Sequence, residues 1–313
     1  MSEQRTLASV AYDTKGKVTR REQFLREMDA VIPWGDLLAL IVPHYPVAGT
    51  GRRPLPLGTM LRVYFLQQWF DLSDPQAEEM LYDSESMRRF ARIELGDDTV
   101  PDESTILRFR HLLEQHQLTA QLFQTVQVLL ERKQLLLKGG TIVDATIIAA
   151  PSSTKNATGT RDPEMKQTRK GQQWYFGMKV HVGTDRRGVV HSLTTTDAAT
   201  ADITQLPHLL HGEETDRYGD RAYWKGEDRQ QWIASGGRYC VNRRERTPVT
   251  DRINRARSRV RAMGEHAFGV VKHLWGFTKV RYRGLAKNTV RVYALFALAN
   301  LYRMRHRLLP QGT

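Results

Sequence analysis

The chain has 313 residues, of which 40% are hydrophobic and 26% charged, and its formal net charge is +13 at pH 7. This balance excludes a disordered or collagen-like chain, and the single cysteine, Cys240, excludes a disulfide scaffold and a cysteine-based metal site. Residues 1–21 lack the apolar core of a signal peptide, and the apolar run at 292–299 is shorter than the ~20 residues that span a bilayer. We therefore expect a cytoplasmic protein with no membrane partner.

The N-terminal part of the chain, residues 1–137, is predicted to be an all-α domain. Apolar residues recur there at the spacing that places them on one face of a helix. The helices predicted from this spacing, or from caps and breakers, cover 24–32, 59–70, 74–90, 102–115 and 118–137.

Two of these predicted helices form a candidate helix-turn-helix at 74–115, because Gly96 and Pro101 separate them. The second would carry Thr105 and Arg108 near its start, where such a helix enters a major groove. The alternative is that the pair belongs only to the core, since its apolar residues also form an ordinary buried stripe.

From residue 138 to 313 the pattern predicts a mixed α/β sheet flanked by helices. β-Branched and alternating segments come first, and strands then alternate with helices. Strands are predicted at 141–148, 175–185, 188–198, 215–220 and 238–242, and helices at 202–212, 227–235, 251–274 and 288–308. The stretch 149–173 is predicted as a polar, basic loop that contains Lys155 and Lys170.

The excess positive charge lies in the last quarter of the chain. From Arg238 onward there are 18 Lys and Arg residues against three acidic ones, which leaves 29 basic and 31 acidic residues in the other 237. A field of this sign attracts polyanions, and the phosphates of nucleic acid are the commonest of them. A ribosome-associated protein and a merely solvated basic face are the alternatives.

Asp144 and Asp220 are candidate site residues on predicted strands. Asp144 lies among Ile142, Val143 and Ala145, where an unpaired carboxylate would cost several kcal/mol, so a cation, a salt bridge or an exposed strand edge has to compensate it. Asp220 follows Gly219 at the C-terminal end of a strand, the usual position of ligands in α/β sheets, although an Asp there is often only a turn or cap residue. The strand that precedes Asp220, TDRYG, is more polar than a central strand should be.

Glu265 lies on a predicted helix whose one face is basic. On a helical projection Ser258, Arg261 and Lys272 fall within about 40° of Glu265. The opposite face is predicted to be the apolar, buried one, and it consists of Ala256, Val260, Met263, Ala267, Val270, Val271 and Leu274. A solvated ion pair between Arg261 and Glu265, worth only about 0.2–0.5 kcal/mol, is the alternative to a function.

Three carboxylates contributed by two strands and a helix are suited to a pair of Mg²⁺ ions. Mg²⁺ prefers a few carboxylates together with water and phosphate oxygens. Two such ions about 3.5–4 Å apart activate the attacking oxygen and stabilise the leaving one in phosphodiester displacement. Basic residues beside the acid would hold the DNA backbone near the scissile phosphate.

At these residues the chain resembles the DDE transposases of bacterial insertion sequences, particularly the insertion-sequence-five family. The pattern Tyr-x2-Arg-x3-Glu-x6-Lys of that family is matched by Arg261, Glu265 and Lys272, with Ser258 in place of the tyrosine. The segments TIVDATIIAAPSSTKN and GDRAYWKG match the surroundings of its two aspartates. The N-terminal PDESTILRFRHLLE is also similar to the family's sequence.

The resemblance implies a ribonuclease-H-like catalytic domain at 138–313, preceded by the helical domain at 1–137. It implies that Asp144, Asp220 and Glu265 bind two Mg²⁺ ions, which Mn²⁺ can replace, and that the enzyme hydrolyses a strand at each transposon end and joins the freed 3′-hydroxyl to target DNA. It also implies a homodimer on paired ends and association with the bacterial nucleoid. The residues predicted to contact DNA are Arg261, Lys272, Ser258, Arg257, Lys155, Lys170, Trp224, Thr105 and Arg108, with Trp224 either stacking on a flipped base or lying in the core.

Two other functions remain open at this stage. A non-catalytic repressor would bind DNA through 74–115 and would leave Asp144 and Glu265 unexplained. A hydrolytic nuclease on the same fold would use the same three acids without strand transfer.

Overall fold

The structure, a computed structural model, describes residues 12, 14–49, 53–155, 159–243, 245 and 247–309. Residues 1–11 lie outside the described residues. They make up about half of the stretch in which no export signal was predicted. The chain divides into two compact units, Met1–Val126 with Leu301–Thr313 and Gln127–Asn300. Each unit is described by itself.

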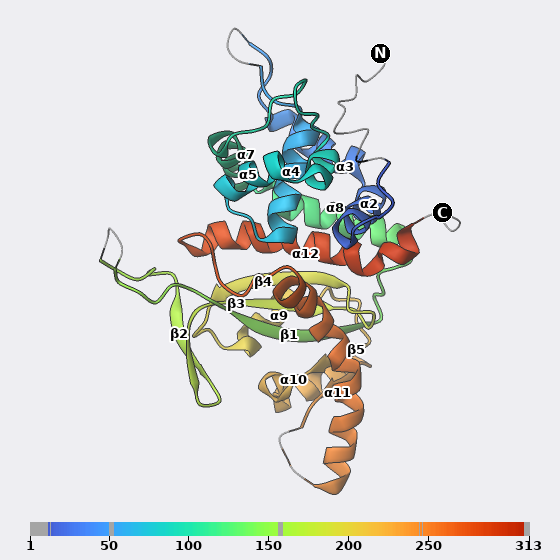
Figure 1. Cartoon of the computed structure of the whole chain (residues 1–313). Coiled ribbons are helices and arrows are strands. Elements are labelled where there is room, and N and C mark those ends of the chain that lie inside the picture. The colour runs from blue at the N-terminus through green and yellow to red at the C-terminus, as the bar shows by residue number, and fades with distance from the viewer. Residues whose placement is uncertain are drawn as a thin grey trace. The chain divides into compact units, whose positions relative to one another are not determined.

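The first unit is helical (Figure 1). Polar side chains begin its helices: Thr19 accepts a hydrogen bond from the N–H of Glu22, Ser73 forms a capping box with Gln76, and Asp102 caps the N–H of Thr105. The helices, of which α8 and α12 extend into the second unit, are α2 (Arg20–Val31), α3 (Trp34–Ile41), η1 (Val42–His44), α4 (Leu57–Phe70), α5 (Asp74–Asp83), α6 (Glu85–Ala91), α7 (Glu103–Gln115), α8 (Leu118–Arg132) and α12 (Leu285–Leu308).

The single helix expected at 74–90 is instead two helices, α5 and α6. Ser84 between them has an extended backbone (φ −110°, ψ 104°), and its N–H still donates to the Met80 carbonyl that ends α5. Serine competes with the helix for backbone hydrogen bonds and favours helix ends, which accounts for the break.

The second unit is built on a six-stranded mixed sheet in which β2, β3, β1, β5 and β6 are neighbours in that order and β4 also pairs with β3. β1 is antiparallel to β3 but parallel to β5, and β5 is parallel to β6. Its elements are β1 (Gly140–Ala149), β2 (Lys166–Lys170), β3 (Gln173–Thr184), β4 (Val190–Asp197), η2 (Asp202–Gln205), α9 (Leu206–Leu209), β5 (Asp216–Gly219), η3 (Arg221–Tyr223), α10 (Gly226–Ala234), β6 (Arg238–Val241), α11 (Pro248–Gly269) and the π-helical turn η4 (Val270–Leu274).

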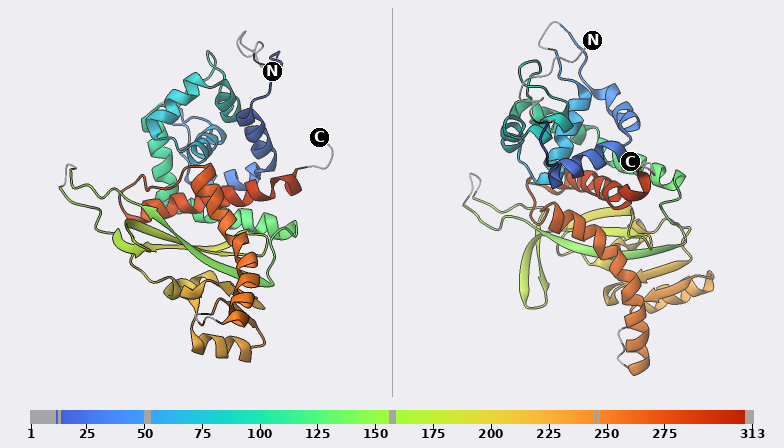
Figure 2. Two further views of the ribbon diagram at one scale, coloured as in Figure 1. Left: turned by 60° about the horizontal axis from the view of Figure 1, so that its bottom comes forward. Right: turned by 45° about the vertical axis from the view of Figure 1, so that its right-hand side comes forward.

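Strand β2 lies in the stretch expected to be a loop. It pairs antiparallel with the start of β3 across a two-residue turn at Gly171 and Gln172, and Gly171 takes the positive φ (62°) that such a turn requires. β2 consists of polar and basic residues and has no apolar face. Because an apolar face is the feature by which a strand is recognised in a sequence, β2 was not predicted. This hairpin extends away from the body of the sheet (Figures 1 and 2).

Successive residues of β1 face opposite sides of the sheet. Val143 belongs to a buried cluster with Leu206 and Leu209 of the η2–α9 segment. Ile142 points to the other side, where Gly264 of α11 packs so closely that an added Cβ would lie 3.1 Å from the Ile142 Cγ2 atom. Because side chains alternate along a strand, Asp144 shares the α11 side with Ile142.

The buried face of α11 is not the one predicted. Its buried residues are Thr250, Asn254, Gly264, Ala267 and Phe268. Of the predicted apolar face only Ala267 and Val271 are buried, whereas Ala256 and Leu274 are exposed. The N-terminal half of α11 extends past the sheet (Figures 1 and 2), and the side of it that is buried carries the polar residues Thr250 and Asn254.

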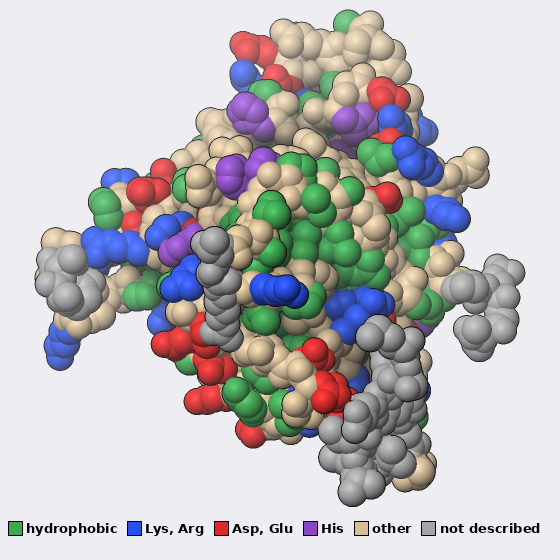
Figure 3. Space-filling view, turned by 90° about the horizontal axis from the view of Figure 1, so that it is seen from above, with side chains coloured by type: hydrophobic (Ala, Val, Ile, Leu, Met, Phe, Trp, Pro, Cys, Tyr) green, Lys and Arg blue, Asp and Glu red, His purple; other side chains and the backbone are tan. Residues whose placement is uncertain are grey.

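The predicted fold class, a mixed α/β sheet flanked by helices and preceded by a helical region, is confirmed. None of the helices in the described part of the chain combines the length and the hydrophobicity needed to traverse a bilayer. On the face shown in Figure 3, hydrophobic, basic and acidic side chains are mixed, so this face is not a uniformly basic surface.

Candidate functional site

The three predicted acids line one cleft of about 740 Å³ in the second unit. Asp144 projects from the middle of β1, Asp220 follows the end of the neighbouring parallel strand β5, and Glu265 comes from α11. The close packing of Gly264 on β1 is what brings the helix, and with it Glu265, next to the strand. The cleft is also lined by basic and polar side chains, among them Thr168, Arg169, Lys170, Lys179, Asp202, Arg261 and Lys272.

Asp144 is the most perturbed of the three acids. Its side chain is 15% exposed, and burial raises the pKa of its carboxyl to about 6. The Arg261 guanidinium and the N–H of Ala145 lower this pKa, while the negative charges of Asp220 and Glu265 raise it. The carboxyl group therefore lies where further positive charge would stabilise its ionised form.

Asp220 both caps a helix and faces the cleft. Its Oδ1 atom accepts a hydrogen bond of 2.8 Å from the N–H of Ala222, which begins η3. Gly219 before it lies so near β1 that an added Cβ would be 3.1 Å from Val143 Cγ2. The cap role considered from the sequence is therefore present, and it leaves the carboxylate on the wall of the cleft.

Arg261 lies between two of the acids. Its Nη2 atom is 3.1 Å from Oε1 of Glu265, and its Nη1 atom is 3.9 Å from Oδ2 of Asp144. The guanidinium is only 23% exposed, so it acts here mainly as the counter-charge of the carboxylates.

Lys272 lies on the wall of the cleft and is tethered to β1. Its Nζ atom donates to the hydroxyl of Thr146 and the carbonyl of Ile147, both at 3.1 Å. Burial lowers the pKa of this ammonium group, and the nearby positive charge of Lys170 lowers it further. Lys170, at the end of β2, also lines the cleft.

Other predicted DNA contacts lie elsewhere in the second unit. Arg257 donates to the carbonyls of Val241 and Tyr239 in β6, and Ser258 accepts from Asn242. Trp224 packs edge-on against Tyr239, with ring centroids 5.4 Å apart, beside the buried cluster. Lys155 is exposed outside the set of residues that lines the cleft.

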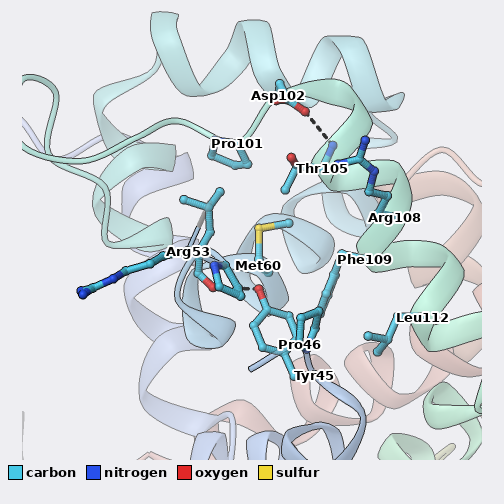
Figure 4. Close-up of a pocket in the computed structure, with 12 residues that line it drawn as sticks. Tyr45, Pro46, Arg53, Met60, Pro101, Asp102, Thr105, Arg108, Phe109 and Leu112 are labelled. Atoms are coloured by element: carbon cyan, nitrogen blue, oxygen red, sulfur yellow. Dashed lines mark hydrogen bonds between the residues drawn. The ribbon is translucent and has the colours of Figure 1, made fainter. Parts of the chain in front are cut away.

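Thr105 and Arg108 lie in the first unit, where they line a pocket of about 300 Å³ (Figure 4). The pocket wall is largely apolar, with Tyr45 and Phe109 in edge-to-face contact at 6.1 Å. Arg108 is exposed, and the N–H of Thr105 donates to Asp102 as the helix cap.

The sequence did not single out Asp202, Lys179 and Arg169, which also line the cleft. Lys179 Nζ is 2.9 Å from Oδ1 of Asp202, so these two charges largely compensate each other. Lys179 occupies a polar position of the alternation in β3, between Met178 and Val180, so nothing in the sequence distinguished it from a solvated side chain. Arg169 lies in β2, the strand that the sequence did not reveal.

The chemistry of the cleft can be tested against a divalent metal ion. Carboxylate oxygens are the ligands that Mg²⁺ prefers, and a cation would favour the ionised form of Asp144, whose pKa is raised chiefly by burial. In the conformation described, however, no three His, Cys, Asp or Glu residues of the described chain are close enough to hold an ion. The acids therefore fit a metal in kind, and in this conformation they are not gathered closely enough to hold one.

Two family models match the chain. One, described as a transposase domain (DUF772), matches residues 12–112, and the other, described as a transposase DDE domain, matches residues 136–301. No solved structure matches the chain. The second match spans more than half of the sequence and contains all three acids, and domains of this kind have a ribonuclease-H-like fold and carry out metal-dependent phosphoryl transfer on DNA. The chain belongs to the family of DDE transposases.

Proposed function

We propose that this protein binds the ends of an insertion sequence, hydrolyses a phosphodiester there to free a 3′-hydroxyl, and joins that hydroxyl to target DNA. The observation that carries the proposal is the meeting of Asp144, Asp220 and Glu265 in one cleft beside Arg261 and Lys272. Asp220 also caps η3 and Glu265 also pairs with Arg261, but neither role accounts for the placement of Asp144 in the same cleft. The wider identification as a transposase supports the same reaction.

In this proposal Asp144, Asp220 and Glu265 hold two divalent ions, Mg²⁺ or in its place Mn²⁺. Such ions, when bound, supply the charge that activates the attacking oxygen and stabilises the leaving one. The three acids supply the oxygen ligands and fix where the scissile phosphate lies. Asp144 has to be ionised for this role, and an approaching cation favours the ionised form.

The basic residues of the cleft are proposed to hold the DNA backbone. Lys272 and Lys170 lie on its walls and would neutralise phosphates on either side of the cut. Arg261 has two sets of partners in the proposed cycle. Without substrate it pairs with the carboxylates of Asp144 and Glu265, and when divalent cations bind those carboxylates, its guanidinium pairs with a DNA phosphate. This exchange would couple the arrival of substrate to the assembly of the catalytic site.

The helical N-terminal part, residues 1–137, is proposed to recognise the ends. The helix pair at 74–115 supports this role, because Arg108 and Thr105 lie near the start of α7 and Arg108 is exposed. We propose that two copies act on paired ends, in the bacterial cytoplasm and on nucleoid DNA.

The test is incubation of the purified protein with labelled transposon-end DNA and a target plasmid, with Mg²⁺ or with EDTA. Asp144→Asn, Asp220→Asn and Glu265→Gln should each reduce cleavage and joining by at least 10³-fold while end binding persists. Glu227→Gln is the matched control, because the Glu227 side chain is 81% exposed and lies outside the cleft.

Each alternative function gives a different result in the same assay. Cleavage without joined products would indicate a hydrolytic nuclease, and binding without cleavage in Mg²⁺ would indicate a repressor. An amide variant that cleaves at the wild-type rate would remove that residue from the proposed ligand set.

A further inference from the structure

Strand β5 carries two charged residues, Asp216 and Arg217, that the proposed reaction does not use. Asp216 is fully buried and is neutralised by Arg186 and Arg238, the latter donating to both of its oxygens. Arg217 is 3% exposed and lies next to it on the opposite side of the strand. The polarity of this strand is therefore explained for Asp216 but not for Arg217.

The guanidinium of Arg217 forms an ion pair with Asp228, but two of its nitrogen atoms, Nε and Nη2, donate no hydrogen bond within the described part of the chain. The guanidinium lies 5.2 Å from the ring centroid of Trp232 and 4.5 Å from that of Tyr239, two cation–π contacts. The nearest carboxylate oxygen, Oδ2 of Asp228, is 3.6 Å from Nη2, which is beyond hydrogen-bonding distance.

Arg217 also lines a cavity of about 490 Å³. Ile203 and Leu206 contribute apolar walls, and Lys225 adds a second cation whose side chain is 56% exposed. The cavity adjoins the cleft along the chain, because η2 contributes Asp202 to the cleft and the next residue, Ile203, to the cavity. Its volume is that of an ordinary small-ligand site.

We propose that this cavity binds a phosphate group, with Arg217 as the buried anchor and Lys225 at the entrance. A buried cation is costly unless its hydrogen bonds are satisfied by a counter-charge. A guanidinium presents parallel N–H donors that match the oxygens of a phosphate. Asp228 compensates Arg217, and Lys225 is the second cation of the cavity wall; its own partner, Glu227, is 3.8 Å away, is 81% exposed and does not line the cavity.

The phosphate can come from a nucleic-acid strand that continues out of the cleft or from a small phosphate compound. The site does not rest on the proposed catalytic function, because it needs only Arg217, Lys225 and the walls of the cavity. A failure to join DNA ends would therefore leave it intact.

The experiment measures binding of inorganic phosphate to the full chain by titration calorimetry, against chloride at equal ionic strength. The wild-type protein should bind phosphate specifically. Arg217→Met should weaken that binding at least tenfold, Arg217→Lys should restore part of it, and Lys225→Ala, a change at an exposed position that does not threaten folding, should weaken it several-fold. Arg229→Met is the matched control, an arginine on α10 that does not line the cavity, and it should bind as the wild type does.

A second arm measures the affinity of the same variants for single-stranded and duplex DNA. Weaker binding of both phosphate and DNA by Arg217→Met supports a phosphate of the DNA strand, and weaker binding of phosphate alone supports a small phosphate compound. The proposal is overturned if the wild type binds phosphate no better than chloride, or if Arg217→Met, folded by circular dichroism, binds it as tightly as the wild type. It is equally overturned if Lys225→Ala and Arg229→Met weaken binding by the same factor.

Discussion

At the scale of single residues, Asp144 shows how a strand can carry a group that is unfavourable for the fold. Its neighbours Val143 and Ile142 are fully buried on the two sides of the sheet, so the backbone position of the carboxyl group is fixed by the packing around it. The penalty for its charge is visible as a pKa raised to about 6. On the proposed function, stability is exchanged for a catalytic role at this position.

This penalty predicts a pH-dependent stability. Because burial raises the pKa of Asp144 from 3.8 to about 6, the folded protein binds a proton that the unfolded chain releases, and the free energy of unfolding falls as the pH rises between these values. The amide of Asp144→Asn does not ionise, so this variant does not lose unfolding free energy as the pH rises. In EDTA at pH 7.5 it should therefore be more stable than the wild type, by up to about 3 kcal/mol.

The measurement is denaturant unfolding of both proteins at pH 3.5 and 7.5. The two curves should nearly converge at pH 3.5, where Asp144 is protonated in the folded protein and mostly protonated in the unfolded chain. A difference that is equal at both pH values would show that the substitution acts through packing and not through charge. Added Mg²⁺ should stabilise the wild type at pH 7.5 and leave Asp144→Asn nearly unchanged.

At the scale of secondary-structure elements, α11 decides where Glu265 lies. Gly264 is the contact point: a Cβ there would be 3.1 Å from both Ile142 Cγ2 and Thr184 Oγ1, which is closer than side chains normally approach. The absence of a side chain at one position of the helix thus sets the distance between Glu265 and Asp144.

Gly264→Val is therefore expected to push the helix away from β1. Overpacking of this kind costs about 1–3 kcal/mol of stability, and cleavage should fall by more than the stability loss explains, because Glu265 moves with the helix. Gly269→Ala is the matched control in the same helix, since an added Cβ meets nothing within 4 Å there. Its stability should stay the same or rise by about 1 kcal/mol. Equal effects of the two substitutions on thermal unfolding would contradict the close-packing argument.

The β2–β3 hairpin is the element most exposed beside the cleft. Trp174 on it is 65% exposed and pairs across the hairpin with Arg169. Lys166, Arg169 and Lys170 make β2 strongly basic, which suits a nucleic-acid strand. An exposed aromatic side chain among lysines and arginines can stack on a nucleobase. The sequence analysis allowed this role for Trp224.

Trp174→Ala is expected to weaken binding of unpaired DNA by about tenfold, since stacking on one base is worth ~1–3 kcal/mol. Fluorescence anisotropy with a labelled single strand measures the effect, and Trp174→Phe should restore most of the affinity. Ile233→Ala, at another exposed apolar side chain on α10, is the control. Unchanged affinity of Trp174→Ala would assign the hairpin to contacts with protein.

The same elements show how far the sequence reaches. The strands β1, β3, β4 and β6 and the helix carrying Glu265 were predictable, because apolar periodicity and breaker residues mark them, whereas β5 was predicted in spite of its polar sequence. The hairpin strand β2 and the break at Ser84 were not, because no apolar face marks the first and a single residue makes the second. The rotation of α11 was predicted wrongly, since its buried face is chosen by Gly264 and by polar contacts such as those of Asn254.

At the scale of the whole molecule, the candidate site depends on the topology of the sheet. Asp144 and Asp220 are distant in sequence but meet because β1 and β5 are adjacent and parallel. Sequence spacing alone cannot give that adjacency, and it came from the resemblance to a known family. Lys179 and Asp202 were missed for the same reason: their pairing becomes visible only when β3 and η2 are placed side by side.

The order in which the three acids occur along the chain has a consequence for the cell that makes this protein. Glu265 is synthesised last, more than a hundred residues after Asp144, and it reaches the cleft only when α11 has docked on β1. On the proposed function, a chain still emerging from the ribosome, or one truncated by a premature stop codon before α11, would hold two of the three acids and is expected not to cut DNA. Cutting of the genome that encodes the element would then have to wait until α11 has been made and has docked on β1.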